Sequence, residues 1–120
     1  MTNYKPTVAF DFDGVIHSYT SGWRGAKNCP DPLVPGIDTV IADLRKDYKI
    51  VVVSSRAGTY EGRLAIRNYL EKYNIEVDGI DCIKPPAIVY IDDRAIHFNG
   101  NTETLVEQIR NFKPWTAKDE

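Results

Sequence analysis

Three short apolar runs constrain the fold of this chain more than any other feature of its sequence. They are rich in β-branched and aromatic residues and span residues 8–10, 50–53 and 88–91. Each run is too short for a typical helix and has no polar residue inside it, which favours a strand buried on both faces of a parallel sheet. A polar residue follows each run directly: Asp11, Ser54 and Asp92.

Apolar residues recur at helical spacing between and after these runs. The patterns cover residues 37–48, 66–73 and 105–112, and a weak strand is expected near residues 80–83. The resulting order of elements implies right-handed crossovers between parallel strands. We therefore predict an α/β fold, specifically a three-layer α/β/α sandwich with a mainly parallel, Rossmann-like sheet.

Length and composition limit what the chain can be. Its 120 residues suffice for one domain, so residues 1–120 are expected to form a single core. A formal charge of -2 gives no overall positive field, so nucleic acid would be bound only through local contacts. Two isolated cysteines and two histidines supply no zinc set. The N-terminus has no apolar signal core, and no run approaches the roughly 18 residues of a membrane span, so we expect a cytoplasmic protein.

The polar residues that follow the runs predict one site. The carboxyl ends of parallel strands meet at the crevice where open α/β sheets bind ligands. Asp11 and Asp13 project the same way if the first strand extends that far, because side chains two apart share a face. Asp92 and Asp93 add two acids at a neighbouring strand end. So much negative charge favours a hard cation with oxygen ligands, and Mg²⁺ is the usual one where phosphate is also bound.

Four ordered segments resemble the motifs of the haloacid dehalogenase-like (HAD) superfamily. They are DFDGV at 11–15, VVVSSR at 51–56, KPPA at 84–87 and IDDR at 91–94, and together they cover nearly the whole chain. The resemblance implies a small phosphatase-type member. An acid at position 13 suits a phosphatase, because superfamily members that displace halide usually lack an acid there.

The resemblance also implies a role for each motif residue. Asp11 would be the nucleophile that forms an aspartyl-phosphate, and Asp13 the general acid and base. Ser54 would hydrogen-bond the phosphoryl group, and Lys84 would stabilise its charge. Mg²⁺ would be held by Asp92 and Asp93 together with the Asp11 carboxylate and the Asp13 backbone carbonyl. In one common form of the fourth motif a glycine precedes the first acid, whereas Ile91 does so here, which leaves open whether Asp92 or Asp93 contacts the metal.

Several residues next to the motifs are candidates for substrate contacts. Ser55 is the alternative to Ser54, and Arg56 either binds substrate or forms a structural ion pair. Residues 17–35 form a long, flap-like connection in which Trp23 and Arg24 either contact substrate or anchor the loop. Three further residues are expected to have structural roles. We expect His17 to form a structural hydrogen bond and Arg94 to form an ion pair or to be solvated. We expect Trp115 to cover the sheet edge or the last helix.

The sequence leaves no room for a separate cap domain, which keeps several functions open. Capless members of the resembling superfamily act on larger substrates or complete the site with another subunit. The phosphorylated substrate is therefore either a small molecule or an exposed phosphate on a macromolecule. A small molecule would be bound by a homo-oligomer in which another subunit completes the site. A nucleic-acid-end phosphatase is one form of the second alternative. A catalytically quiet module that binds phosphate or magnesium and acts through a partner is the alternative from another class.

Overall fold

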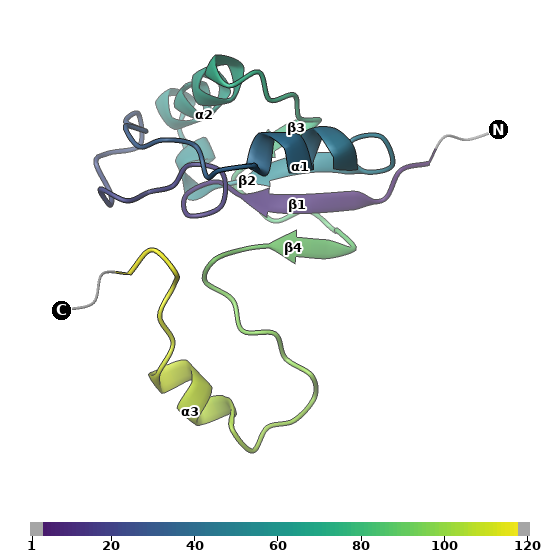
Figure 1. The fold of residues 1–120 in the computed structure, drawn as a ribbon, viewed down its shortest axis with the longest axis vertical. Helices are drawn as coiled ribbons and strands as arrows, with labels where there is room; N and C mark the ends of the chain where they lie inside the picture. The colour runs from purple at the N-terminus through teal and green to yellow at the C-terminus, as the bar shows by residue number, and fades with distance from the viewer. Residues whose placement is uncertain (1–3, 118–120) are drawn as a thin grey trace.

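The chain folds into strands and helices that follow one another along the sequence and build one sheet with helices beside it (Figure 1). The computed structural model describes residues 4–117. Its elements are β1 (Thr7–Asp11), α1 (Ile37–Leu44), β2 (Lys49–Val53), the short 3₁₀ helix η1 (Ser55–Gly58), α2 (Tyr60–Lys72), β3 (Gly79–Asp81), β4 (Val89–Ile91) and α3 (Leu105–Arg110). None of the helices within residues 4–117 is both long and apolar enough to span a bilayer.

The four strands form one sheet in which every neighbouring pair is parallel. Their order is β3-β2-β1-β4, so β1 lies in the interior and β3 and β4 are the edges. Asp11 is paired with Val53, and Phe10 with Ile91, which brings the last residues of three strands to one end of the sheet. The predicted α/β fold with a parallel, Rossmann-like sheet is confirmed, and the weak strand near residues 80–83 is β3.

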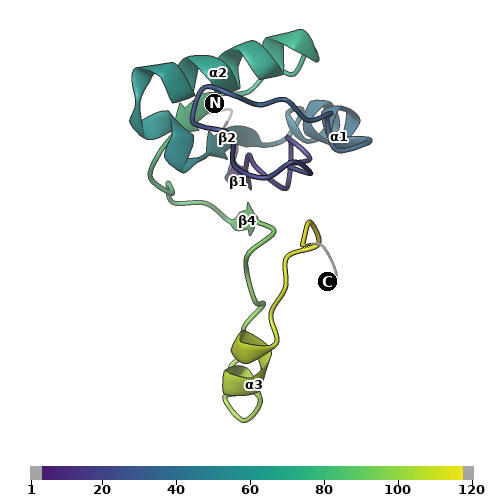
Figure 2. The same cartoon turned by 90° about the vertical axis from the view of Figure 1, so that its left-hand side faces the viewer.

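Both α1 and α2 cover the same face of this sheet. Val8 and Phe10 of β1 and Val52 of β2 lie in one buried cluster with Ile41 of α1 and Ile66 of α2. Since strand residues two apart point to the same side, all these contacts lie on one face. Figure 2 shows both helices on that side of the strands, while the connection from β3 to β4 passes on the other.

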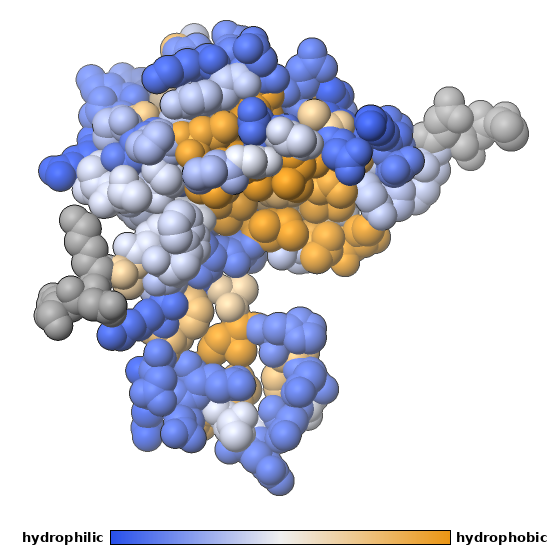
Figure 3. Space-filling model, in the orientation of Figure 1, coloured by the Kyte–Doolittle hydropathy of each residue, from blue (hydrophilic) through white to orange (hydrophobic). Residues whose placement is uncertain are grey.

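The segment from β4 onward differs from the sequence-based expectation. Residues 88–91 were expected to be buried on both faces, but all are exposed, from 38% at Ile91 to 62% at Ile88. The physical reason is that no helix within residues 4–117 packs over β4: α1 and α2 lie over β1 and β2, and no residue of α3 is buried. The helix expected over residues 105–112 forms as α3, yet no residue of α3 is buried, and the helix stands away from the sheet (Figure 1). Within residues 4–117 the sheet therefore carries packed helices on one face, and the second helix layer of the predicted three-layer sandwich is not formed. Figure 3 shows hydrophobic surface that continues from below α1 to the region of β4.

The first residues of the long connection between β1 and α1 belong to the core, whereas none of residues 19–35 is buried. Phe12 and Ile16 are fully buried in the same cluster as the strands. The backbone N–H of Val34 donates to the carbonyl of Ile16, which ties the end of the connection to its beginning. The connection is therefore ordered by the residues that flank the candidate site.

Removing the buried side chain of Ile66 tests this core. We expect Ile66→Ala to lower the free energy of unfolding by about 2–5 kcal/mol, because the cavity lies between α2 and the sheet. Urea unfolding followed by circular dichroism measures the loss. Leu64→Ala on the exposed side of the same helix is the control and should cost only a small part of it. Equal losses would contradict the placement of α2.

Candidate functional site

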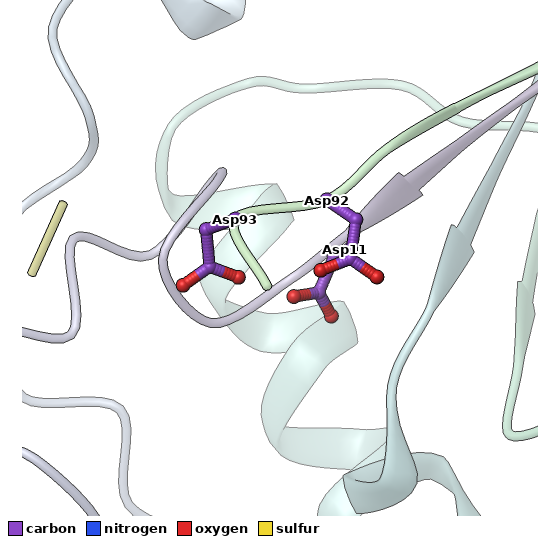
Figure 4. A group of neighbouring side chains, drawn as sticks. All are labelled: Asp11, Asp92 and Asp93. Carbon is purple, nitrogen blue, oxygen red and sulfur yellow. The ribbon is translucent and has the colours of Figure 1, made fainter. Parts of the chain in front are cut away.

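Three carboxylates meet at the carboxyl end of the sheet. Asp11 is the last residue of β1, and Asp92 and Asp93 directly follow β4. One carboxylate oxygen from each lies within 4.8 Å of the others, and Figure 4 shows the three side chains grouped where the two strands end. Asp92 and Asp93 therefore both belong to the group, together with Asp11.

The surroundings of Asp11 raise the pKa of its carboxyl group. Burial raises the pKa of Asp11, a hydrogen bond with Asp93 raises it further, and the charges of Asp92 and Asp93 add to the effect, so that the pKa reaches about 8. Asp11 thus keeps a proton at neutral pH when no cation is bound. A bound cation would reverse this shift, because positive charge favours the ionised carboxylate.

The Asp93 carboxylate lies against Gly14 in the turn that follows β1. Gly14 has a φ of 86°, a left-handed conformation that glycine adopts without strain. A Cβ at this position would collide with the Asp93 carboxylate, so the absence of a side chain lets the two segments approach. The buried Oδ1 of Asp93 has no hydrogen-bond partner within residues 4–117.

The three carboxylates fit a hard divalent cation. All the donors are oxygens, which Mg²⁺ and Ca²⁺ prefer. The unpaired Oδ1 of Asp93 could coordinate the cation in place of its missing hydrogen bond, and the raised pKa of Asp11 would fall. Asp11, Asp92 and Asp93 are therefore the residues that could hold a metal. The Asp13 carboxylate is not one of them.

Lys84 lies beside the acidic group. It lines a small recess together with Asp11, Asp92 and Tyr90. Its Nζ is 3.4 Å from Oδ2 of Asp92 and lies over the Tyr90 ring at 5.4 Å from the centroid. The structure thus brings together the predicted Asp11, Lys84 and Asp92, although the segment that carries Lys84 is remote in sequence from β1.

Asp13 contacts Arg56 and His17 and is not part of the group of three carboxylates. Its Oδ2 accepts from Nε of Arg56 at 2.7 Å, and its Oδ1 accepts from Nη2 at 3.1 Å. Nδ1 of His17 lies 2.8 Å from the same Oδ1. Partial burial raises the pKa of Asp13, but the hydrogen bonds from His17 and Arg56 outweigh burial and hold it below its ordinary value. Asp11 and Asp13 therefore have opposite electrostatic environments.

Arg56 joins Asp13 to the long loop. Its side chain is fully buried. Nη1 donates to three backbone carbonyls of the loop, those of Gly25, Ala26 and Asn28. The guanidinium also lies over the Trp23 ring, 4.7 Å from its centroid. Arg56 thus forms the structural ion pair that the sequence left open as an alternative to substrate binding, and Trp23 packs on it although the indole remains 56% exposed.

His17 extends the same network. Its Nε2 accepts from the backbone N–H of Asp31 at 3.0 Å, which makes Nδ1 the nitrogen that donates to Asp13. The hydroxyl of Tyr69 on α2 donates to the Asp31 carbonyl. The structural hydrogen bond expected of His17 is confirmed. No local sequence pattern predicts these contacts of Asp31 and Tyr69, because Asp31 is 14 residues from His17 and 38 residues from Tyr69.

The remaining candidates divide between buried and exposed positions. Ser54 is buried and its Oγ accepts from the backbone N–H of Arg56 at 3.2 Å, which caps η1, whereas Ser55 is exposed. Arg24 and Arg94 are exposed.

The expectation that Trp115 covers the sheet edge or the last helix is wrong: its indole N–H donates to the Gly14 carbonyl at 2.6 Å, next to the site. The reason is a contact between residues 101 positions apart, which no local pattern encodes.

Comparison with known proteins supports the fold alone. No family model matches the chain, and no curated protein matches it. One chain of a solved Pnkp1/Rnl/Hen1 complex superimposes on it with a TM-score of 0.50 at 18% sequence identity. The match covers 96% of this chain but only 37% of the neighbour's chain. The chain therefore shares an α/β arrangement with a part of that larger protein.

Replacing Arg56 tests its role as the anchor of Asp13 and the loop. We expect Arg56→Lys to lower the free energy of unfolding by about 3 kcal/mol, because lysine cannot pair with both carboxylate oxygens and reach the loop carbonyls. Urea unfolding measures the effect. Arg67→Lys, at an exposed position of α2, is the matched control and should stay within about 0.5 kcal/mol of wild type. Equal stability of the two variants would exclude the anchoring role.

The raised pKa of Asp11 predicts how stability depends on pH without metal. Between about pH 5 and pH 8 the folded protein keeps a proton that the unfolded chain, with a pKa of 3.8, has released. The free energy of unfolding should therefore fall as pH rises, by up to about 1.4 kcal/mol per unit. Chemical unfolding in the presence of a chelator measures this slope.

The matched variants are Asp11→Asn and Asp38→Asn. Asp11→Asn should flatten the slope between pH 5 and pH 8, since the titrating group is gone. Asp38 is exposed in the first turn of α1, and its substitution should leave the slope as in wild type. The assignment fails if all three proteins show the same dependence on pH.

Proposed function

We propose that this chain is a magnesium-dependent phosphatase of the HAD-like type that hydrolyses a phosphate monoester through an aspartyl-phosphate on Asp11. The observation that carries the proposal is the grouping of Asp11 with Asp92 and Asp93, with Lys84 in the same recess, at the carboxyl end of a parallel sheet. This is the edge where α/β sheets bind ligands. The residues are also those that the four sequence motifs imply.

Asp11, Asp92 and Asp93 would hold Mg²⁺ in this proposal. The ion would supply positive charge that orients the phosphate and offsets the charge on its oxygens. Ionisation of Asp11 is required for attack, and its raised pKa in the metal-free protein explains why a cation would be needed at neutral pH.

The chain's own groups then account for both half-reactions. A carboxylate oxygen of Asp11 attacks phosphorus, the ester P–O bond breaks, and the leaving oxygen takes a proton. Water next attacks the phosphorus of the aspartyl-phosphate, loses a proton, and releases inorganic phosphate and free Asp11. Lys84 would neutralise charge on the phosphoryl oxygens. Ser54 accepts a hydrogen bond with Oγ, so its own O–H remains available to donate to the phosphoryl group.

Asp13 would manage the proton in both steps. Its pairing with Arg56 and His17 keeps it ionised in the free protein, which suits the step that takes a proton from water. Donation to the leaving group requires Asp13 to carry a proton first. A doubly charged phosphate beside Asp13 would raise its pKa and favour that state. In this scheme Arg56 and His17 position Asp13 and do not touch the substrate.

Loss of the nucleophile tests the proposal directly. Asp11→Asn should lower Mg²⁺-dependent hydrolysis of an aryl phosphate at least 1000-fold, because an amide is a very poor nucleophile toward phosphorus. Asp38→Asn, an exposed Asp→Asn change away from the site, should keep wild-type activity. Unfolding curves of both variants confirm that each is folded. Activity retained by folded Asp11→Asn protein would refute the nucleophile.

The same assay separates the competing functions. Wild-type protein that is stabilised by Mg²⁺ but turns over no phosphate ester would be a quiet binding module. A panel that pairs small phosphate esters with 3′- and 5′-phosphorylated oligonucleotides tests the nucleic-acid-end alternative. A strong preference for the oligonucleotides would establish that alternative, whereas a preference for a small ester would exclude it.

A further inference from the structure

The C-terminal part of the chain exposes most of its apolar side chains. We call residues 95–114 the arm. Val106 and Ile109 of α3 are each 60% exposed, and Phe112 just after the helix is 37% exposed. Their spacing places them on one side of the helix. An apolar helix side of this kind is normally buried against another element.

The strand that leads into the arm is also uncovered. β4 is hydrogen-bonded to β1 on one side and is an edge of the sheet. Val89 and Ile91 stand opposite Val8 and Phe10 in register, so they extend the buried face of the sheet beyond the reach of α1 and α2. Their exposed fractions are 43% and 38%. An edge strand with uncharged, apolar residues readily pairs with another chain.

Two global measurements show how much surface is left uncovered. The accessible surface is 8267 Å², whereas a compact monomer of 13.6 kDa exposes roughly 6,600 Å². The radius of gyration is 15.5 Å against about 13.6 Å for a compact domain of this length. The excess of about 1,700 Å² per chain is larger than the ~800 Å² that each partner buries in a standard stable interface.

The arm is held at both ends, which disfavours its folding back over its own strand. At one end β4 pairs with β1, and at the other the indole of Trp115 donates to the Gly14 carbonyl. Residues 111–114 alone connect α3 to that anchor. Figures 1 and 2 show the arm extending from the body and returning to it. Glu103, Glu107, Arg110 and Lys113 give the arm both signs of charge, which favours a protein surface over a polyanion or an anionic membrane.

We propose that two copies of this chain associate about a twofold axis, each placing the apolar side of α3 over the exposed side of β4 of its partner. A twofold axis covers both exposed apolar surfaces at once, because each copy has one apolar side of α3 and one uncovered strand β4. The contact is independent of the phosphatase proposal. It buries Val89 and Ile91 together with Val106, Ile109 and Phe112.

Sedimentation equilibrium of the full chain at micromolar concentration tests the proposal. The expected result is a dimer, with twice the mass of the 13.6 kDa chain. The double variant Val106→Glu/Ile109→Glu should dissociate at least about 100-fold more readily, since each copy would bury two unpaired carboxylates. Leu64→Glu is the control and should remain a dimer, because Leu64 is an exposed apolar residue on α2, which connects β2 to β3, and β3 is the edge strand opposite β4.

The outcomes that overturn the proposal are equally definite. A wild-type monomer overturns it, and X-ray scattering then shows whether the arm has closed on its own chain or stays extended for another kind of partner. A dimer that survives the double substitution overturns it too, because the contact would lie elsewhere. If the glutamate variant does not fold, Val106→Ser/Ile109→Ser is judged by the same two criteria.

Discussion

The buried ion pair between Arg56 and Asp13 is the contact on which the rest of the site depends. Two charged side chains inside a small protein are costly to desolvate, and they are tolerated here because nearly every polar group has a partner. Arg56 binds both oxygens of Asp13 and three loop carbonyls, and His17 binds Asp13 from the other side. The pair therefore fixes the turn after β1, the start of η1 and the long loop at once.

This arrangement gives two acids of the same strand end different properties. Asp11 lies among other carboxylates and tends to hold a proton, whereas Asp13 lies between two donors and remains ionised. The difference arises from the neighbours of each side chain. Asp11 ends the regular strand beside Asp92 and Asp93, whereas Asp13 lies in the turn before Gly14, where Arg56 and His17 bind it. A sequence motif with two aspartates two positions apart thus produces two unlike sites.

The sequence predicted those parts of the fold that depend on local patterns. Strand ends at Asp11, Ser54 and Asp92 follow from apolar runs, and their meeting follows from the geometry of a parallel sheet. The structural ion pair of Arg56 was one of its predicted alternatives, but its partner Asp13 and the roles of Asp31 and Trp115 could not be predicted, because each is set by a contact across the fold. The burial of β4 was predicted wrongly for a related reason: an apolar run identifies a strand, but whether a helix packs over that strand depends on contacts across the fold.

The strands that carry the acidic residues differ in burial: β1 carries Asp11, and β4 leads to Asp92 and Asp93. Asp11 belongs to β1, which is buried between β2 and β4. Asp92 and Asp93 follow β4, a strand of three residues with exposed side chains, and Asp93 is further positioned by its close approach to Gly14. Binding a cation across the three carboxylates would therefore link the weaker segment to the stronger one. By linkage, whatever stabilises β4 would strengthen cation binding, and the cation would in turn stabilise β4.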